Sequence, residues 1–290
     1  MSEPLKLFSG VGLKGAGPDL KSSLETLERA DNPLLNWSLE DFVLFFDHVS
    51  REMISANSPI ASLIRDHDLG FLIAWMKASS IKGMLDSQLS QTKSVKGELS
   101  RAVLQWPRGI VVHWIAGNVP VLGIISLMQG LLSRNKNIVK APKNFGDVLY
   151  TILKYISTLS VYNGDRELKG SELLHCSLII YLERSDIKSQ AELSKLADVR
   201  VAWGGMEAVT SISSLPSKID CKDLVFGPKV SLAILTESAL DELDKKELLD
   251  IADGLARDIF TFGQAGCNAP HNLILIGDNR RFDEFINFFS

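Results

Sequence analysis

The run of residues from Gly109 to Leu132 carries no acidic or basic side chain unless His113 is protonated. A helix of that length is long enough to cross a membrane. The middle of the run, however, is interrupted by the turn residues GNVP at 117–120, with Val- and Ile-rich sequence before them and Leu- and Met-rich sequence after them. Because doubly wound sheets bury both faces of their strands, a buried strand, a turn and a buried helix explain the same residues. The run therefore predicts a parallel α/β sheet and no membrane span.

The sequence from Trp106 onward repeats this alternation of strand and helix. The expected strands are Ile110–Trp114, Asn137–Lys140, Leu173–Leu182, Val199–Trp203 and Ser231–Leu235. The expected helices between them are Val121–Leu132, Gly146–Ser160, Ile187–Leu196 and Met206–Ile212. Such alternation is typical of βαβ units and a parallel sheet. A charged helix over Glu237 to Arg257 and a strand over Asn272–Ile276 are expected to follow.

Residues 1–105 are predicted to be mainly helical. Ser38 and Asp41 form a capping pattern ahead of an amphipathic run, and a second helix is expected over Ile60 to Lys77. The chain therefore divides into a helical segment (1–105), an alternating strand and helix segment (106–230) and a further segment (231–290). The last part ends at Ser290 within an apolar pattern, so we expect a fragment of a longer natural protein.

Composition excludes some classes of protein. The net charge of -4 gives no basic surplus, so no nucleic-acid partner is expected. The three cysteines, Cys176, Cys221 and Cys267, form no CxxC pair and no metal cluster, and their odd number argues against a disulfide framework. The N-terminus carries no signal peptide pattern. These features predict a cytoplasmic protein without a bound metal.

Cys267 lies in the segment QAGCN at 264–268. A nucleophilic thiol needs an accessible setting, and small flanking residues let a carbonyl approach the sulfur. The alternative is a structural cysteine, which is our interpretation of Cys176 in its apolar strand and of Cys221 beside Lys222.

Three further segments follow strands. Asn118 either caps the next helix or points its amide into the cleft at the strand end, where it could donate to an oxyanion. Gly204 and Gly205 open a helix and allow a phosphate to approach its N-terminus, although this turn lacks the Gly-x-Gly-x-x-Gly spacing. Lys140, followed closely by Lys143, either binds a ribose or its 2′-phosphate or is simply solvated.

Together these segments resemble the aldehyde dehydrogenase superfamily, and within it the acyl-CoA reductase family to which the fatty acid reductase of bacterial bioluminescence belongs. The similar segments are Gly117 to Val121, Ile138 to Pro142, Val201 to Gly205, Phe226 to Ser231 and Asp258 to Pro270. The resemblance implies an aldehyde-dehydrogenase-like fold, in which residues 106–230 form a Rossmann-like dinucleotide-binding domain after the helical segment 1–105. Residues 231–290 would then be the start of a truncated catalytic domain. The resemblance also implies that Cys267 is the nucleophile and that Asn118 holds the oxyanion. Lys140 would then lie near the adenosine ribose, and Gly204 and Gly205 beside the pyrophosphate and nicotinamide.

One departure from the superfamily is informative. Hydrolytic aldehyde dehydrogenases carry a glutamate that activates water, and Val225 stands at that position here. The resemblance therefore implies NADPH-dependent reduction of a fatty acyl-CoA, or another acyl thioester, to the aldehyde through a Cys267 acyl-enzyme. A homo-oligomer or complex is expected of the full-length protein.

Three alternatives remain at this stage. One is an inactive, truncated nucleotide-binding relic of the same fold. Another is a thioesterase or amidase that uses Cys267 with His271, four residues further along the chain. The third is an oxidising aldehyde dehydrogenase, which Val225 disfavours.

Overall fold

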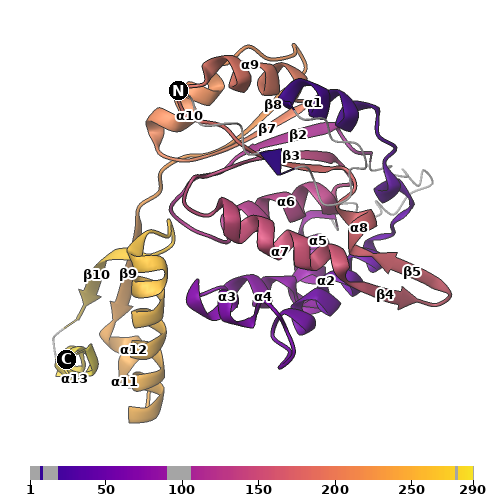
Figure 1. The fold of residues 1–290 in the computed structure, drawn as a ribbon. Helices are drawn as coiled ribbons and strands as arrows, with labels where there is room; N and C mark the ends of the chain where they lie inside the picture. Colours follow the sequence, from indigo (N-terminus) through magenta and orange to yellow (C-terminus); the bar gives the residue numbers. More distant parts are fainter. Residues whose placement is uncertain (1–6, 9–18, 90–105, 278–279, 290) are drawn as a thin grey trace, which may run out of the picture. The chain divides into compact units, whose positions relative to one another are not determined.

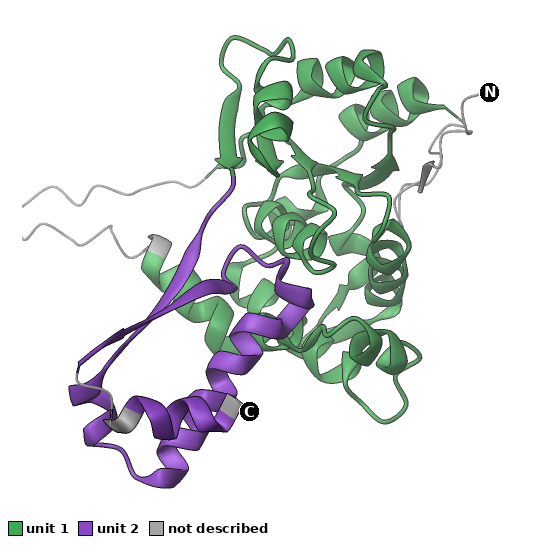
Figure 2. Cartoon of the chain, turned by 90° about the vertical axis from the view of Figure 1, so that its left-hand side faces the viewer, with its two compact units in different colours: residues 1–227 green, residues 228–290 purple. Residues whose placement is uncertain are grey.

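The computed structural model describes residues 7–8, 19–89, 106–277 and 280–289 of the chain. The chain forms two compact units, residues 1–227 and residues 228–290, which are described separately (Figures 1 and 2). The first unit includes both the N-terminal helices and the Rossmann-like sheet. The division into three domains stays a prediction.

A parallel sheet forms the centre of the first unit. Within the described residues it has six strands in the order β1-β6-β3-β2-β7-β8. They are β1 (Leu7–Phe8), β2 (Ile110–Trp114), β3 (Lys136–Ala141), β6 (Ser177–Tyr181), β7 (Val199–Trp203) and β8 (Lys222–Phe226). All run parallel except β1, which pairs antiparallel with β6. The predicted α/β sheet is therefore confirmed.

Helices cover both faces of the sheet (Figure 1). One face carries α1 (Leu20–Arg29), α9 (Ile187–Leu196) and α10 (Met206–Ser213), and the other carries α6 (Leu122–Leu132) and α7 (Gly146–Thr158). All five residues of β2 are buried between these layers. The uncharged run is thus a strand, a turn and a helix, as predicted. No helix of the described residues has the length and apolar character that crossing a bilayer requires.

The N-terminal helices are η1 (Pro33–Asn36), α2 (Leu39–Met53), α3 (Ala61–Asp66), α4 (Gly70–Met76) and α5 (Ala78–Leu89). Trp37, just after η1, and three phenylalanines of α2 (Phe42, Phe45 and Phe46) form a cluster of aromatic rings. The Ser38–Asp41 capping box is confirmed at the start of α2. The single helix expected over Ile60 to Lys77 is wrong. The chain ends α3 with a left-handed residue, Asp68 (φ 56°), and begins α4 anew.

A hairpin between α7 and β6 was not predicted. Its strands β4 (Ser160–Asn163) and β5 (Arg166–Lys169) lead into the short helix α8 (Gly170–Leu173). Because α8 occupies the residues before Ser177, the strand expected over Leu173–Leu182 begins later than predicted. Arg166 lies 3.1 Å from Asp41 and 3.8 Å from Glu172, so it ties the hairpin to α2 and α8.

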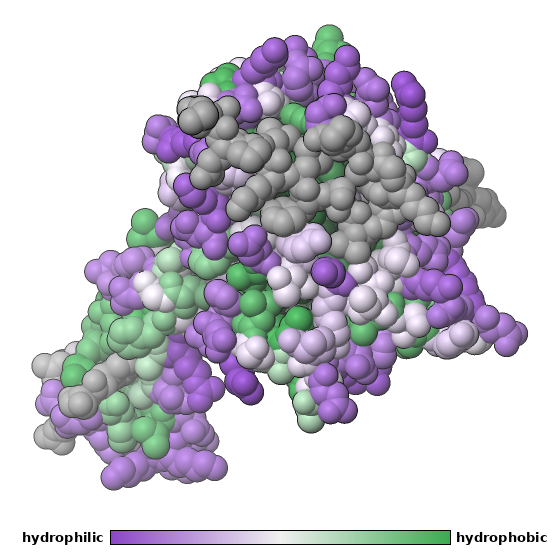
Figure 3. Space-filling model, in the orientation of Figure 1, coloured by the Kyte–Doolittle hydropathy of each residue, from purple (hydrophilic) through white to green (hydrophobic). Residues whose placement is uncertain are grey.

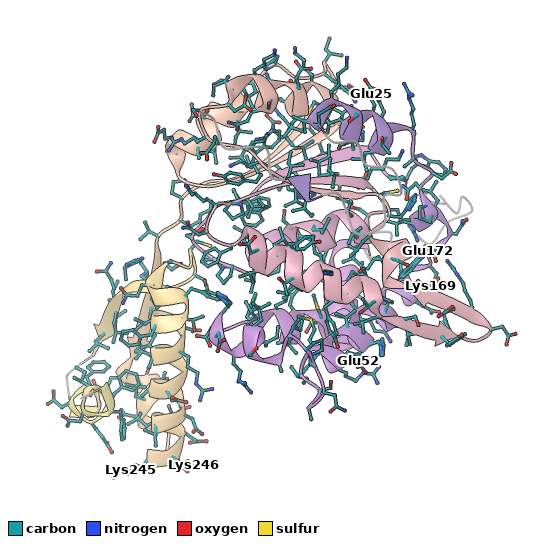
Figure 4. All side chains as sticks on the ribbon, in the orientation of Figure 1. Glu25, Glu52, Lys169, Glu172, Lys245 and Lys246 are labelled. Carbon is teal, nitrogen blue, oxygen red and sulfur yellow. The ribbon has the colours of Figure 1, made fainter. Side chains whose placement is uncertain are left out.

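The second unit is a parallel strand pair with helices. It contains β9 (Ser231–Thr236), β10 (Pro270–Ile276), α11 (Glu237–Asp241), α12 (Lys245–Phe260), η2 (Thr261–Gln264), α13 (Arg280–Ile286) and η3 (Asn287–Phe289). The single helix expected over Glu237 to Arg257 is wrong, because an Asp244–Glu247 capping box starts α12 separately. Lys245 and Lys246 follow that cap in the first turn of α12 (Figure 4). Hydrophobic residues gather on the visible face of this unit (Figure 3). Leu232 and Ile234 on β9 are among its exposed hydrophobic residues.

Candidate functional site

The site in the first unit lies at the carboxyl ends of the central strands. β2 pairs with β3 on one side and with β7 on the other. The connection through α6 leads from β2 to β3, whereas the connection through α10 leads from β7 to β8 in the opposite direction. In open α/β sheets, ligands bind in the crevice outside such a switch point. The loops after β2 and β7 therefore flank the expected ligand position.

Asn118 lies in the loop after β2 and is exposed. The N-cap of α6 is Val121, so the interpretation of Asn118 as the helix cap is wrong. Gly117 keeps this loop close to the end of β3, since a Cβ at Gly117 would lie only 3.2 Å from the Pro142 Cβ. The structure thus brings Asn118 to the same sheet edge as Lys140.

Lys140 lies near the end of β3, where its carbonyl accepts a hydrogen bond from the Ile115 N–H at 3.3 Å. Burial lowers the pKa of the Lys140 ammonium; nearby Glu183 raises it and Arg184 lowers it further. Lys143, two residues beyond the strand, is exposed. Cations that could face an anionic ligand at this edge are therefore Lys140 on β3 and Lys143 just after it, whereas Arg184 is paired with Glu207.

The turn at Gly204 and Gly205 opens α10. The Gly204 N–H donates to the Phe226 carbonyl at 3.2 Å, and a Cβ at Gly204 would approach Ala208 Cβ to 2.9 Å. Gly205 is the N-cap of α10, provides no side-chain cap, and has open space where a Cβ would stand. First-turn N–H groups without a side-chain cap suit a phosphate. The indole N–H of Trp114, at the end of β2, is buried without a partner among the described residues. These features fit a dinucleotide.

Trp203 is a residue of this edge that the sequence analysis did not identify as functional. Its ring stacks on Phe226 with 3.9 Å between centroids and 9° between planes. The two residues end β7 and β8 and are register partners.

A Gly-x-Gly-x-x-Gly spacing does occur in the sequence, at residues 10–15, which lie outside the described residues.

Cys267 lies in the second unit, in the turn between η2 and β10, and is exposed. Its carbonyl accepts a hydrogen bond from Ser231 Oγ at 2.7 Å. The segment just before it holds Phe262, Gly263 and Gln264 in succession at φ between 56° and 65°. Left-handed backbone at non-glycine residues costs energy and is concentrated at functional sites. The turn therefore combines access to the sulfur with a constrained backbone.

The other two cysteines differ from Cys267. Cys176 is fully buried; its thiol donates to the Asp31 carbonyl at 3.0 Å, and burial raises its pKa to about 11. Burial also raises the pKa of Cys221. A raised pKa leaves less thiolate at neutral pH. Within the described residues no hydrogen bond joins Cys267 to His271, and no group of three or more His, Cys, Asp or Glu could hold a metal ion.

The structure thus brings together Asn118, Lys140, Gly204 and Gly205 at one edge of the first unit. Cys267 belongs to the second unit.

Comparisons with known proteins agree on one family. Residues 24–290 match the family model described as acyl-CoA reductase (LuxC). A long-chain acyl-protein thioester reductase of Vibrio harveyi is 29% identical over 211 residues, which cover 71% of this chain and 40% of that protein. One from Photobacterium phosphoreum is 28% identical over 272 residues, which cover 87% of this chain and 52% of that protein. The chain therefore spans about half, or less, of the length of these relatives.

Solved structures agree on the fold. Lactaldehyde dehydrogenase from Escherichia coli matches with a TM-score of 0.58 at 14% identity, covering 92% of this chain and 54% of that one. A propionaldehyde dehydrogenase of Rhodopseudomonas palustris with bound propionyl-CoA matches with a TM-score of 0.58 at 13% identity, covering 96% and 58%. The fold is therefore that of the aldehyde dehydrogenases.

Proposed function

The chain belongs to the LuxC family of acyl-CoA reductases, and we propose on that basis that it takes part in the NADPH-dependent reduction of a fatty acyl thioester to the aldehyde. The observation that carries the proposal is Cys267, the exposed cysteine, in a turn built of small residues and left-handed backbone. The names of the relatives, long-chain acyl-protein thioester reductases, favour an acyl thioester as substrate. The acyl donor is then a CoA or a carrier-protein thioester.

The first chemical step is acyl transfer to Cys267. Its thiolate attacks the thioester carbonyl, a tetrahedral oxyanion forms, and the donor thiol leaves as the carbon–sulfur bond breaks. The Cys267 N–H and the Asn118 amide would donate to that oxyanion. The result is an acyl group held on Cys267.

The dinucleotide would be held by residues of the first unit. The N–H groups at the start of α10, exposed by Gly204 and Gly205, suit the pyrophosphate, while Lys140 and Lys143 suit the adenosine ribose and its 2′-phosphate. When bound, NADPH supplies the hydride that reduces the acyl carbonyl. The cations favour NADPH over NADH.

The residue at position 225 limits the proposed outcome. The resemblance aligns Val225 on β8 with the glutamate of hydrolytic aldehyde dehydrogenases, and a valine side chain cannot take a proton from water. We therefore expect the acyl group on Cys267 to be reduced or passed to another thiol in preference to hydrolysis. A separate observation disfavours the thioesterase with His271: no hydrogen bond links the described Cys267 and His271 side chains. A homo-oligomer and a cytoplasmic location remain predictions.

The proposal is tested by mapping the acyl-enzyme. We expect labelled long-chain acyl-CoA, incubated with the full-length protein, to modify Cys267 and neither Cys176 nor Cys221, because burial suppresses the thiolate of the other two. Mass spectrometry of the digested protein locates the adduct. Cys221→Ser is the matched control and should keep the label, whereas Cys267→Ala should lose it. A label that persists in Cys267→Ala would point to a different nucleophile.

A further inference from the structure

A line of hydrogen-bonded side chains runs between the sheet and α6. Trp203 Nε1 donates to Ser126 Oγ at 3.1 Å, and Ser126 Oγ lies 2.8 Å from His113 Nδ1. His113 Nε2 lies 3.1 Å from Asn137 Oδ1. These four residues come from β7, α6, β2 and β3, so the line connects four elements of the first unit.

One arrangement of protons satisfies every member of this line. Asn137 Nδ2 donates to the Asn135 carbonyl at 2.8 Å, which leaves Asn137 Oδ1 as an acceptor. His113 Nε2 must therefore carry a proton, and in a neutral ring Nδ1 then accepts one from the Ser126 hydroxyl. The Ser126 oxygen is left to accept from the indole of Trp203, which can only donate. Burial lowers the pKa of His113 to about 4, which agrees with a neutral ring.

The three inner members of the line, Ser126, His113 and Asn137, are sealed from water. His113 and Ser126 are each 1% exposed and Asn137 is fully buried. Gly130 is needed to make room, because a Cβ there would overlap Asn137 Oδ1 and lie 3.2 Å from His113 Nε2. A buried polar group that loses its partner is costly, so each member fixes its neighbours.

The end of the line that reaches the ligand edge is Trp203. Its N–H is held by Ser126 and its face by Phe226, so the indole is fixed in position and in plane. The next residue, Gly204, donates its N–H to the Phe226 carbonyl. The glycine turn at the start of α10 is therefore attached to a ring that the buried line holds in place.

We infer that Trp203 is a positioning residue for the dinucleotide: the line through Ser126 and His113 holds its indole against Phe226, and the pair sets the Gly204–Gly205 turn for the pyrophosphate. This inference rests on the proposed function, since it assumes that the edge binds NADPH. Trp203 acts through the turn and does not react.

The test compares two buried serines. Ser126→Ala removes the central link, and Ser194→Ala removes an equally buried hydroxyl on α9 that accepts from Arg200 at 3.0 Å on the opposite face of the sheet. The dissociation constant of NADPH is measured in the full-length protein from the fluorescence of the bound nucleotide, and the melting temperature is measured alongside. We expect both variants to melt earlier, but Ser126→Ala alone to bind NADPH about tenfold more weakly, or about 1.4 kcal/mol.

A second variant removes the hydrogen bond between Trp203 and Ser126 from the Trp203 side. Trp203→Phe keeps an aromatic ring beside Phe226 and removes the N–H, and we expect a similar loss of NADPH affinity. Because both changes break one link, the double variant should bind no more weakly than Trp203→Phe alone.

Each outcome decides between the alternatives. Unchanged NADPH binding in Ser126→Ala, or an equal loss in Ser194→Ala, would mean that the line supports the fold alone. If Ser126→Ala does not fold, unchanged binding in Trp203→Phe would overturn the inference by itself. Failure of the wild type to bind NADPH or NADH would remove the dinucleotide from the proposed function and the inference with it.

Discussion

Asn118 lies in the loop after β2, ahead of the Val121 N-cap of α6. Because Asn118 is exposed and stands outside α6, we expect its replacement to change the rate of acylation far more than the melting temperature. If its amide donates to the oxyanion, Asn118→Ser shortens the reach and should slow acylation of Cys267 by about 100-fold or more, the usual cost of losing one such donor. The rate of Cys267 acylation is measured by stopped flow. The affinity for NADPH, which should not change, is the control. Near-normal acylation would assign the oxyanion donor to another group.

His113 gives stability a pH dependence of known sign. Burial lowers its pKa to about 4, whereas in an unfolded chain it is about 6.5. Between these values the unfolded chain binds a proton that the folded chain does not. The free energy of unfolding that His113 contributes is therefore fully present above pH 6.5 and is lost as the pH falls toward 4. The total is roughly 3 kcal/mol, of which about 2 kcal/mol is lost by pH 5.

Urea unfolding at pH 7.5 and pH 5 checks this contribution. The wild type should lose more free energy of unfolding over that interval than His113→Gln, which has no titrating ring. Parallel losses in the two proteins would show that His113 is not the group responsible.

The break between α3 and α4 shows what the sequence pattern could not reveal. The Leu69 N–H donates to the Ile64 carbonyl at 2.9 Å and the Asp68 N–H to the Arg65 carbonyl at 3.2 Å, which is the pattern of a Schellman motif. Glycine usually holds the left-handed position of that motif, and here it is Asp68. The apolar period continued through the break, so the sequence predicted one helix.

The same motif gives a prediction at the scale of the element. Asp68→Gly should raise the free energy of unfolding by up to about 1 kcal/mol, because glycine has no Cβ penalty in the left-handed region. Asp68→Ala should lower it, since alanine tolerates this region less well than aspartate. Chemical denaturation of the three proteins should rank them Gly, Asp, Ala. Any order that places Ala above Asp would contradict the role of backbone conformation.

Elements with strong local signals were predicted closely. The bounds of β2, β7 and α9 match the expected ranges, because apolar runs and turn residues mark their ends. The β4–β5 hairpin was missed although Asn163-Gly164, at the end of β4 and the start of the turn, is a strong hairpin signal, with Gly164 at φ 60°. Strand β8 was missed because it is an edge strand exposed along its whole length and so carries no buried period.

At the scale of the whole molecule, the sequence motifs predicted which candidate residues share a sheet edge, but not which side chains touch. The motifs gave Asn118, Lys140 and the glycine turn, which the fold brings to one sheet edge because they end parallel strands. The Trp203–Ser126–His113 line could not be predicted, since its members are far apart in sequence and meet only when α6 packs on the sheet. The division at Gly227 is likewise a property of packing.

The position of Phe226 determines where the chain can be cut by a protease to separate the two units. Strand β8 ends at Phe226, one residue before the boundary after Gly227. A cleavage site inserted after Gly227 would leave the stacked ring on Trp203 and the carbonyl that Gly204 uses. A site inserted before Lys222 would instead carry both away, together with the edge strand that protects β7.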